Sequence, residues 1–150
     1  MLFDKINSYQ NGQIRISLAA AGTSVFADTV QSLCRHLIAQ APCPLHVEGI
    51  DEVSHLGSLE LKIKAIEDFD KRLVGKVLSA VDLSNARVMI LPDHPVPIKL
   101  RQHTTTPVPF AICGCGIEVD STPAYNEKNA ASGACGLLKK DELMKLVLGN

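Results

Sequence analysis

The sequence predicts a layered α/β fold, because strand-like segments alternate with segments of helical periodicity. Three segments carry most of this prediction. Residues 13–20 and 86–91 are rich in β-branched and other apolar side chains. Residues 58–81 instead repeat apolar side chains at the spacing of an amphipathic helix. No internal repeat or low-complexity linker divides the chain, so we expect a single domain over residues 1–150.

Size and composition are those of a folded globular domain. The chain has 150 residues, of which 46% are hydrophobic and 21% charged, and its formal net charge is -1. No basic run is present, so we expect neither nucleic acid nor an anionic membrane as a partner. No apolar stretch approaches the roughly 20 residues that span a bilayer. The N-terminus lacks the pattern of a signal peptide, and the five cysteines lack zinc-finger spacing. The expected location is the cytoplasm.

The first half of the chain predicts two strands and a helix. Residues 13–20 alternate β-branched apolar side chains and should form a strand. Residues 28–40 have helical spacing, with Asp28 as N-cap, and this helix should end before Pro42. Residues 44–50 follow as a short, buried strand.

The strongest helical signal is residues 58–81. Ser58 is a suitable N-cap, and acid–base pairs four residues apart occupy the polar side. The opposite, apolar side is formed by these residues: Ile63, Ile66, Phe69 or Asp70, Leu73 and Val77.

The second half predicts two strands and a C-terminal helix. Residues 86–91 are almost continuously apolar, as in a central strand covered on both faces, and residues 108–113 form another strand. The helix covers residues 141–148 and ends at Gly149. Cys113 and Cys115 flank a glycine, and we interpret them as the small residues of a tight strand end rather than as metal ligands.

Side chains that can bind metal follow the predicted strands. Asp51 and His55 come after the 44–50 strand, Asp93 and His94 come after the 86–91 strand, and His103 precedes the 108–113 strand. Ligand sites in open α/β sheets form beyond the carboxyl ends of strands, so the first two loops should converge. His103 must reach them through its loop or from an antiparallel edge strand.

The donor types favour Mn²⁺ or Zn²⁺, because carboxylate and imidazole occur together. Five ligands exceed what one open catalytic ion needs and point to two ions, the usual device of phosphate-ester chemistry. Each motif also has an ordinary interpretation. An Asp–His pair four residues apart arises by chance, and Asp-His before proline often forms a turn. Residue types alone leave the metal site and the turn both open.

The motif order makes the sequence resemble a known family. The stretch LHVEGIDEVSHLGSLELKIKAIEDFDKRLVG, followed by RVMILPDHPVPIKLRQHTTTPVPFAI, resembles the cofactor-independent (2,3-bisphosphoglycerate-independent) phosphoglycerate mutases of archaeal type, in the alkaline phosphatase superfamily. The resemblance runs from about residue 22 through the C-terminal helix. It implies a mostly parallel sheet flanked by helices and the interconversion of 3-phosphoglycerate and 2-phosphoglycerate through a phosphoserine.

The resemblance also implies a role for each ligand. Asp51, His55 and His103 would hold one ion, while Asp93 and His94 would hold a second. The ions would be manganese, with zinc or magnesium as alternatives. No serine of this sequence matches the nucleophile's context, and the substrate domain has no counterpart. The sequence is therefore similar to the C-terminal part of the family only, truncated at the N-terminus.

Two functional hypotheses follow. In the first, the chain is the metal-binding part of a phosphoglycerate mutase, inactive alone and acting on phosphoglycerate when the missing part is supplied. In the second, it is a non-catalytic or repurposed module that binds metal or serves as a partner subunit. A truncated sheet would expose an edge and apolar faces, so we expect a homo-oligomer or a partner chain that covers them.

Overall fold

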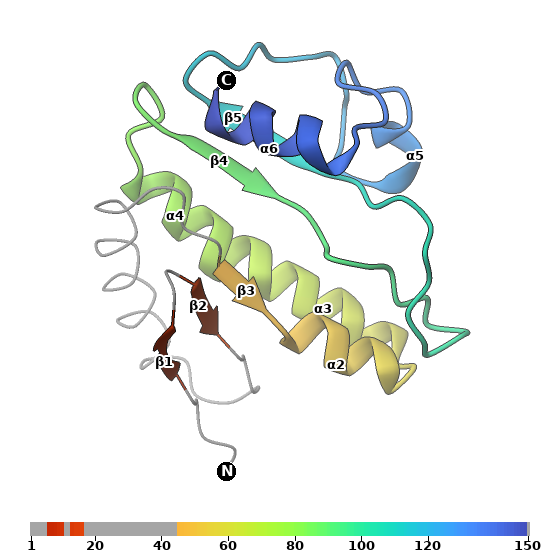
Figure 1. Cartoon of the computed structure of the whole chain (residues 1–150). Coiled ribbons are helices and arrows are strands. Elements are labelled where there is room, and N and C mark those ends of the chain that lie inside the picture. The colour runs from red at the N-terminus through yellow and green to blue at the C-terminus, as the bar shows by residue number, and fades with distance from the viewer. Residues whose placement is uncertain (1–5, 11–12, 17–44, 150) are drawn as a thin grey trace. The chain divides into compact units, whose positions relative to one another are not determined.

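The computed structural model describes residues 6–10, 13–16 and 45–149 (Figure 1). The chain divides into two compact units. The first contains residues 1–81 and 96–102, and the second contains residues 82–95 and 103–150. The helix expected at 28–40 lies outside the described residues, and the single domain stays a prediction.

A three-stranded sheet belongs to the first unit. Its order is β1 (Ile6–Gln10), β2 (Gln13–Ile16), β3 (Leu45–Val47). β1 and β2 are antiparallel, whereas β2 and β3 are parallel. Only two residues separate β1 from β2 in the sequence, and so short a connection joins antiparallel neighbours. β1 was not predicted, and β3 is shorter than the predicted strand because a helix begins at Gly49.

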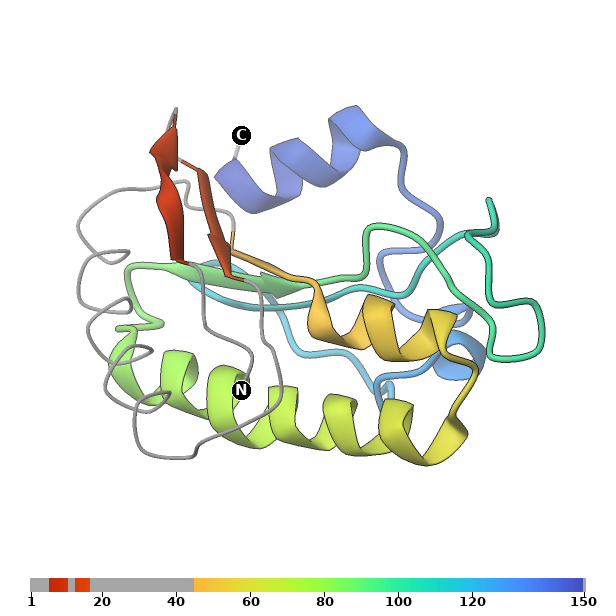
Figure 2. The same ribbon diagram turned by 90° about the horizontal axis from the view of Figure 1, so that it is seen from below.

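The helices of the first unit follow directly from β3. They are α2 (Gly49–His55), α3 (Leu59–Phe69), the π-helical turn η1 (Asp70–Val74) and α4 (Gly75–Ala80). Gly57, at φ +74°, makes the turn between α2 and α3. The Ser58 hydroxyl then accepts a hydrogen bond from the Leu61 N–H at 3.3 Å, which confirms the predicted N-cap. Figure 2 shows α2 folded back beside the long helix that α3, η1 and α4 form together.

Leu73 is the centre of the first unit's core. Its side chain is 4% exposed and packs against Leu45, Val47, Phe69 and Val77. The strand β3 and the three consecutive helical segments therefore share one small apolar cluster. Burial of a leucine in such a cluster stabilises the fold by about 2 kcal/mol.

Because of the π turn, the predicted apolar side of the helix is wrong at Ile63 and Ile66. Ile63 and Ile66 are 48% and 47% exposed, while their neighbours Lys62 and Ala65 are half-buried. A π turn holds one residue more than an α turn, so positions before it shift by one relative to positions after it. Counting back from Leu73 along a regular α-helix therefore selects the wrong residues.

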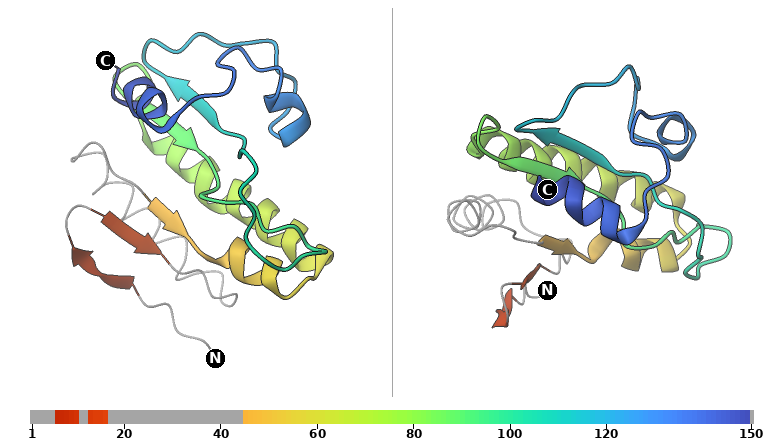
Figure 3. Two further views of the ribbon diagram at one scale, coloured as in Figure 1. Left: turned by 45° about the vertical axis from the view of Figure 1, so that its right-hand side comes forward. Right: turned by 45° about the horizontal axis from the view of Figure 1, so that its top comes forward.

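The second unit is built on a two-stranded ribbon. β4 (Arg87–Ile90) pairs antiparallel with β5 (Ala111–Gly114), and the short helix α5 (Glu127–Ala130) and α6 (Lys140–Leu148) follow. Figure 3 shows α6 alongside the ribbon. The Arg87 guanidinium connects them, because Nε donates to the Cys115 carbonyl at 2.6 Å and Nη1 to the Leu146 carbonyl at 2.8 Å. Gly149, at φ +80°, ends α6 as predicted.

The α/β class is confirmed. Within the described residues, some strand pairs are parallel and others antiparallel. Only β2–β3 is parallel, which differs from the mostly parallel sheet that we expected. Twenty residues without a helix join β4 to β5, and a parallel pair would need a crossover, usually helical. β4 is half-buried rather than covered on both faces. The short helix α5 carried no clear signal in the sequence.

Candidate metal centre

Asp51 and His55 lie on one face of α2. They are four residues apart on the helix, and Asp51 Oδ2 is 3.4 Å from His55 Nε2, with both side chains about one-third exposed. Between them Ser54 is 1% exposed, and its hydroxyl donates to the Ile50 carbonyl at 2.6 Å. The expectation that this pair sits in a loop is wrong. Ser54 lies three residues after Asp51, so the acid–histidine pair lies beside the buried side of α2.

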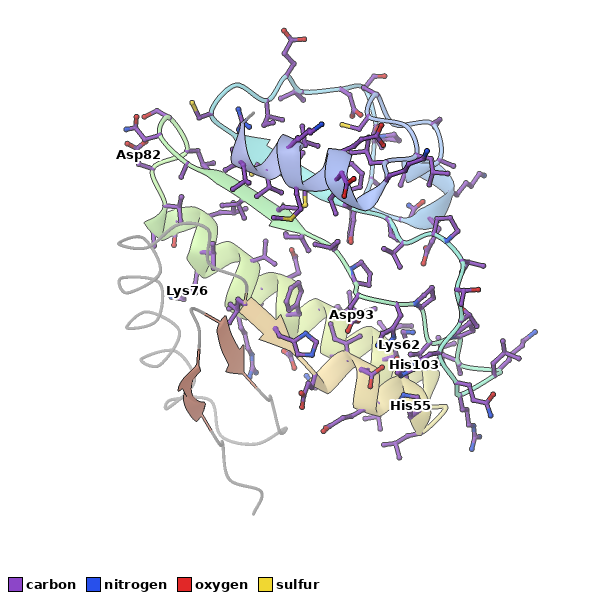
Figure 4. All side chains as sticks on the ribbon, in the orientation of Figure 1. His55, Lys62, Lys76, Asp82, Asp93 and His103 are labelled. Carbon is purple, nitrogen blue, oxygen red and sulfur yellow. The ribbon has the colours of Figure 1, made fainter. Side chains whose placement is uncertain are left out.

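His55 also contacts the segment 96–102, which belongs to the same unit. Its Nδ1 is 2.9 Å from the main-chain carbonyl oxygen of Arg101. Lys62 holds the other end of the segment, since its Nζ donates to the Val96 carbonyl at 2.8 Å and Val96 is 5% exposed. Figure 4 labels His55 on α2 and Lys62 on α3.

The second unit holds the other three predicted ligands. Asp93 and His94 directly follow the β4 segment, with Asp93 Oδ2 at 3.3 Å from His94 Nε2. The His94 N–H donates to Asp93 Oδ1 at 3.0 Å. The His94 and His103 rings are stacked, with centroids 3.6 Å apart and planes inclined by 23°. Next to them, the Thr104 N–H donates to the Pro95 carbonyl at 3.0 Å, which closes the loop.

The geometry of both pairs fits a divalent ion. Metal–ligand distances of about 2.0–2.1 Å at tetrahedral angles separate two ligand atoms by about 3.3 Å. The two acid–histidine pairs have separations of 3.4 Å and 3.3 Å. Their oxygen and nitrogen donors are those that Mn²⁺ and Zn²⁺ accept.

The structure thus brings the five predicted residues together in two groups. Asp51 and His55 form the first, and Asp93, His94 and His103 form the second. The convergence of both groups on one sheet edge stays a prediction, as does the ligand assignment. β3 and β4, whose carboxyl ends precede the two groups, belong to separate sheets within the described residues.

Sequence reasoning missed two contributors near His55. The Arg101 carbonyl is a main-chain group, and no side-chain pattern signals where a carbonyl points. Lys62 was not singled out, because the π turn, which shifts the residues before it by one position, was not expected. The strand at 44–50 was predicted to be buried, but the side chain of His46 in this strand is 42% exposed, and its Nε2 lies 3.9 Å from Glu48 Oε1.

Other features of the described residues are ordinary. Cys113, Cys115 and Cys135 are free thiols. Within the described residues, no helix combines the length and the apolar character that a membrane crossing requires.

Comparisons with known proteins identify the family. The Metalloenzyme superfamily matches residues 22–150. The chain is 46% identical over 106 residues to the 2,3-bisphosphoglycerate-independent phosphoglycerate mutase of Methanothrix thermoacetophila. It is 40% identical over 107 residues to the mutase of Methanosarcina mazei, and 43% over 108 residues to the probable mutase of Geobacter sulfurreducens.

These matches cover 69% of this chain and 27% of each of the three relatives, so the chain spans about a quarter of their length. Among solved structures, the PH0037 protein from Pyrococcus horikoshii is similar, with a TM-score of 0.73 and 27% identity. That similarity covers 82% of this chain and 36% of the solved one. The recognised resemblance is confirmed, and the chain belongs to the Metalloenzyme superfamily.

Proposed function

We propose that this chain is the metal-binding part of a phosphoglycerate mutase, which interconverts 3-phosphoglycerate and 2-phosphoglycerate in the cytoplasm. The observation that carries the proposal is the acid–histidine pair that recurs in each unit at a separation suited to one metal ion. The mutase relatives support the choice of substrate, since they share up to 46% identity with the segment that carries both pairs.

The proposed ligand assignment follows the motif order. Asp51, His55 and His103 would hold one ion, and Asp93 and His94 would hold the other. Manganese is the proposed ion, with zinc or magnesium as alternatives. When bound, divalent ions offset charge on a transferring phosphoryl group and lower the pKa of the hydroxyl that accepts it.

The residues of this chain would hold and orient these ions. Each aspartate supplies negative charge that offsets the charge of the cation, and each histidine supplies a neutral nitrogen donor whose ring orientation its neighbours fix. We assign no serine of this sequence as the phosphoryl acceptor. We propose that the acceptor and the substrate-binding arginines belong to a part of the enzyme beyond this sequence.

A metal titration tests the ligand assignment. We expect wild type to bind Mn²⁺, measured by isothermal titration calorimetry, and a His94→Ala, His103→Ala double variant to bind it much more weakly, because each proposed ion loses one ligand. His46→Ala serves as the matched control, because it removes an imidazole outside both groups. Equal Mn²⁺ binding by wild type and the double variant would show that the assignment is wrong.

An activity assay tests the mutase proposal separately. We expect the chain alone, loaded with Mn²⁺, to give no turnover in a coupled 2-phosphoglycerate assay. Addition of the remaining three-quarters of a mutase relative, expressed as a separate chain, should restore turnover that depends on His94. Turnover by this chain alone would refute the claim that its sequence contains no phosphoryl acceptor.

A second candidate function is a non-catalytic or repurposed module that binds metal and serves as a partner subunit. The fact that favours it is coverage, since the chain spans about a quarter of the mutase relatives. Mn²⁺ binding without any turnover after complementation would favour this second function over the first.

A further inference from the structure

We propose that Gly57 and Arg101 are positioning residues, which orient the His55 ring so that its Nε2 faces a metal ion together with Asp51. The inference rests on the proposed metal site and assigns a role to two residues outside the ligand set. All four residues belong to the first unit.

The hydrogen bond of His55 determines its tautomer. Nδ1 lies 2.9 Å from the Arg101 carbonyl oxygen, and a carbonyl oxygen can only accept, so Nδ1 carries the hydrogen. In a neutral ring the lone pair is then on Nε2, which lies 3.4 Å from Asp51 Oδ2. A histidine whose second nitrogen donates to a carbonyl is the usual arrangement of a metal ligand.

The backbone of Arg101 is held in an unusual conformation. Its φ is +53°, and among the described residues it is the only one other than glycine with a positive φ. Such outliers cost about 1–3 kcal/mol and persist only where their surroundings impose them. Here the N–H groups of Leu100 and Arg101 both donate to the Pro97 carbonyl at 2.9 Å. Lys62 holds Val96 at the start of the same segment.

Gly57 supplies the space that Arg101 occupies. A Cβ at position 57 would overlap with Arg101 Nε and would lie 2.7 Å from Cζ and 2.9 Å from Nη2. The guanidinium thus rests directly over the turn between α2 and α3. A side chain at position 57 would force the guanidinium to move and would strain the turn at φ +74°. We predict that this disturbance reaches the Arg101 carbonyl that faces His55.

Imidazole NMR of the metal-free chain tests the orientation. At pH 8, where an ordinary histidine is neutral, long-range ¹H–¹⁵N spectra should show His55 with its hydrogen on Nδ1. His55→Gln identifies the signal. Gly57→Ala should convert His55 to the Nε2–H tautomer or a mixture. Gly136→Ala is the matched control, since Gly136 has φ +62° and no atom within 4 Å of an added Cβ.

Mn²⁺ titration of the same variants links orientation to binding. Gly57→Ala should weaken binding about 10- to 100-fold at the ion that needs His55, as loss of second-layer contacts to metal ligands typically does. Gly136→Ala should bind as wild type does. The Gly57→Ala, Arg101→Gly double variant should recover most of the affinity, because residue 101 keeps its carbonyl while the overlapping guanidinium is gone.

The possible failures are distinguishable. An Nε2–H tautomer of His55 in wild type, or a Gly57→Ala variant with the wild-type tautomer and affinity, overturns the positioning role. Failure of the double variant to recover, although circular dichroism shows it folded, also overturns it. Equal Mn²⁺ affinity in wild type and His55→Gln instead overturns the ligand assignment of the proposed function.

Discussion

The end of β5 offers a sharp test of the second unit, through the substitution Gly114→Ala. Gly114 has φ +117°, which residues with a side chain rarely adopt. An added Cβ would overlap with the Ala86 carbonyl oxygen and lie 3.0 Å from both the Ala86 carbonyl carbon and Arg87 Cα. These are main-chain atoms at the start of β4, so no side-chain rotation can relieve the overlap.

The expected cost of Gly114→Ala has two parts. The backbone conformation costs about 1–3 kcal/mol for a non-glycine residue. The overlap also pushes away the Ala86 carbonyl, which accepts a 3.0 Å hydrogen bond from the Cys115 N–H, and loss of that bond costs about 1 kcal/mol. We therefore expect the free energy of unfolding to fall by about 2–4 kcal/mol, a large share of a typical 5–15 kcal/mol.

Urea unfolding followed by circular dichroism, with hydrogen exchange at Cys115 as a local probe, measures this cost. Gly136→Ala is the control, since Gly136 also has a positive φ, +62°, but has open space around the added Cβ. Its cost should stay near 1 kcal/mol. If Gly114→Ala costs no more than Gly136→Ala and leaves Cys115 protected, the reasoning from main-chain overlap is wrong.

Three further predictions concern separate features. Leu73→Ala should lower the free energy of unfolding by about 2–5 kcal/mol in urea titrations, since Leu73 is the buried centre of its cluster; a cost below 1 kcal/mol would contradict this. Burial, and then the nearby charge of Glu127, raise the pKa of Tyr125 to about 12, and its hydroxyl donates to the Pro109 carbonyl. Its stabilising contribution should be complete below pH 10 and disappear as the pH rises through 12; an absorbance titration at alkaline pH should show one late tyrosine step that Tyr125→Phe removes. Ile63→Glu should reduce any self-association in analytical ultracentrifugation, because Ile63 is an exposed apolar residue of α3; an unchanged distribution of species would exclude this surface.

Periodicity made the main elements predictable. The helix at 58–81 repeats its pattern over many turns and starts at a serine whose hydroxyl accepts a hydrogen bond from Leu61, so its start was visible in the sequence. The C-terminal helix likewise ends at Gly149 in the left-handed conformation. α2 had no comparable signal, because its N-cap, Glu48, makes no capping hydrogen bond through its side chain. Its first two residues were therefore assigned to the preceding strand, and the other five to a loop.

The sequence predicted the residue types of the candidate site but not the groups that orient them. Acid–histidine motifs are readable because carboxylate and imidazole are recognisable side chains. The spacing of Asp51 and His55 suits a helix as well as a loop, so only the structure could decide. The direction of the carbonyl that orients His55 depends on the positive φ of Arg101. The identity of the residue, arginine, does not predict such a φ.

The π turn at Asp70–Val74 has a consequence for protein engineering. Deleting one residue there would let the chain run as a continuous α-helix, and the segment before the turn would rotate by about 100° relative to the segment after it. Ile63 and Ile66 would then turn toward the core, and Lys62 would turn away from the Val96 carbonyl. The one extra residue of the π turn thus has two effects. It leaves Ile63 and Ile66 exposed, and it places the Lys62 ammonium where it can hold the segment that leads to Arg101. A redesigned sequence for this helix must therefore offset its apolar pattern by one residue between the segment before the turn and the segment after it.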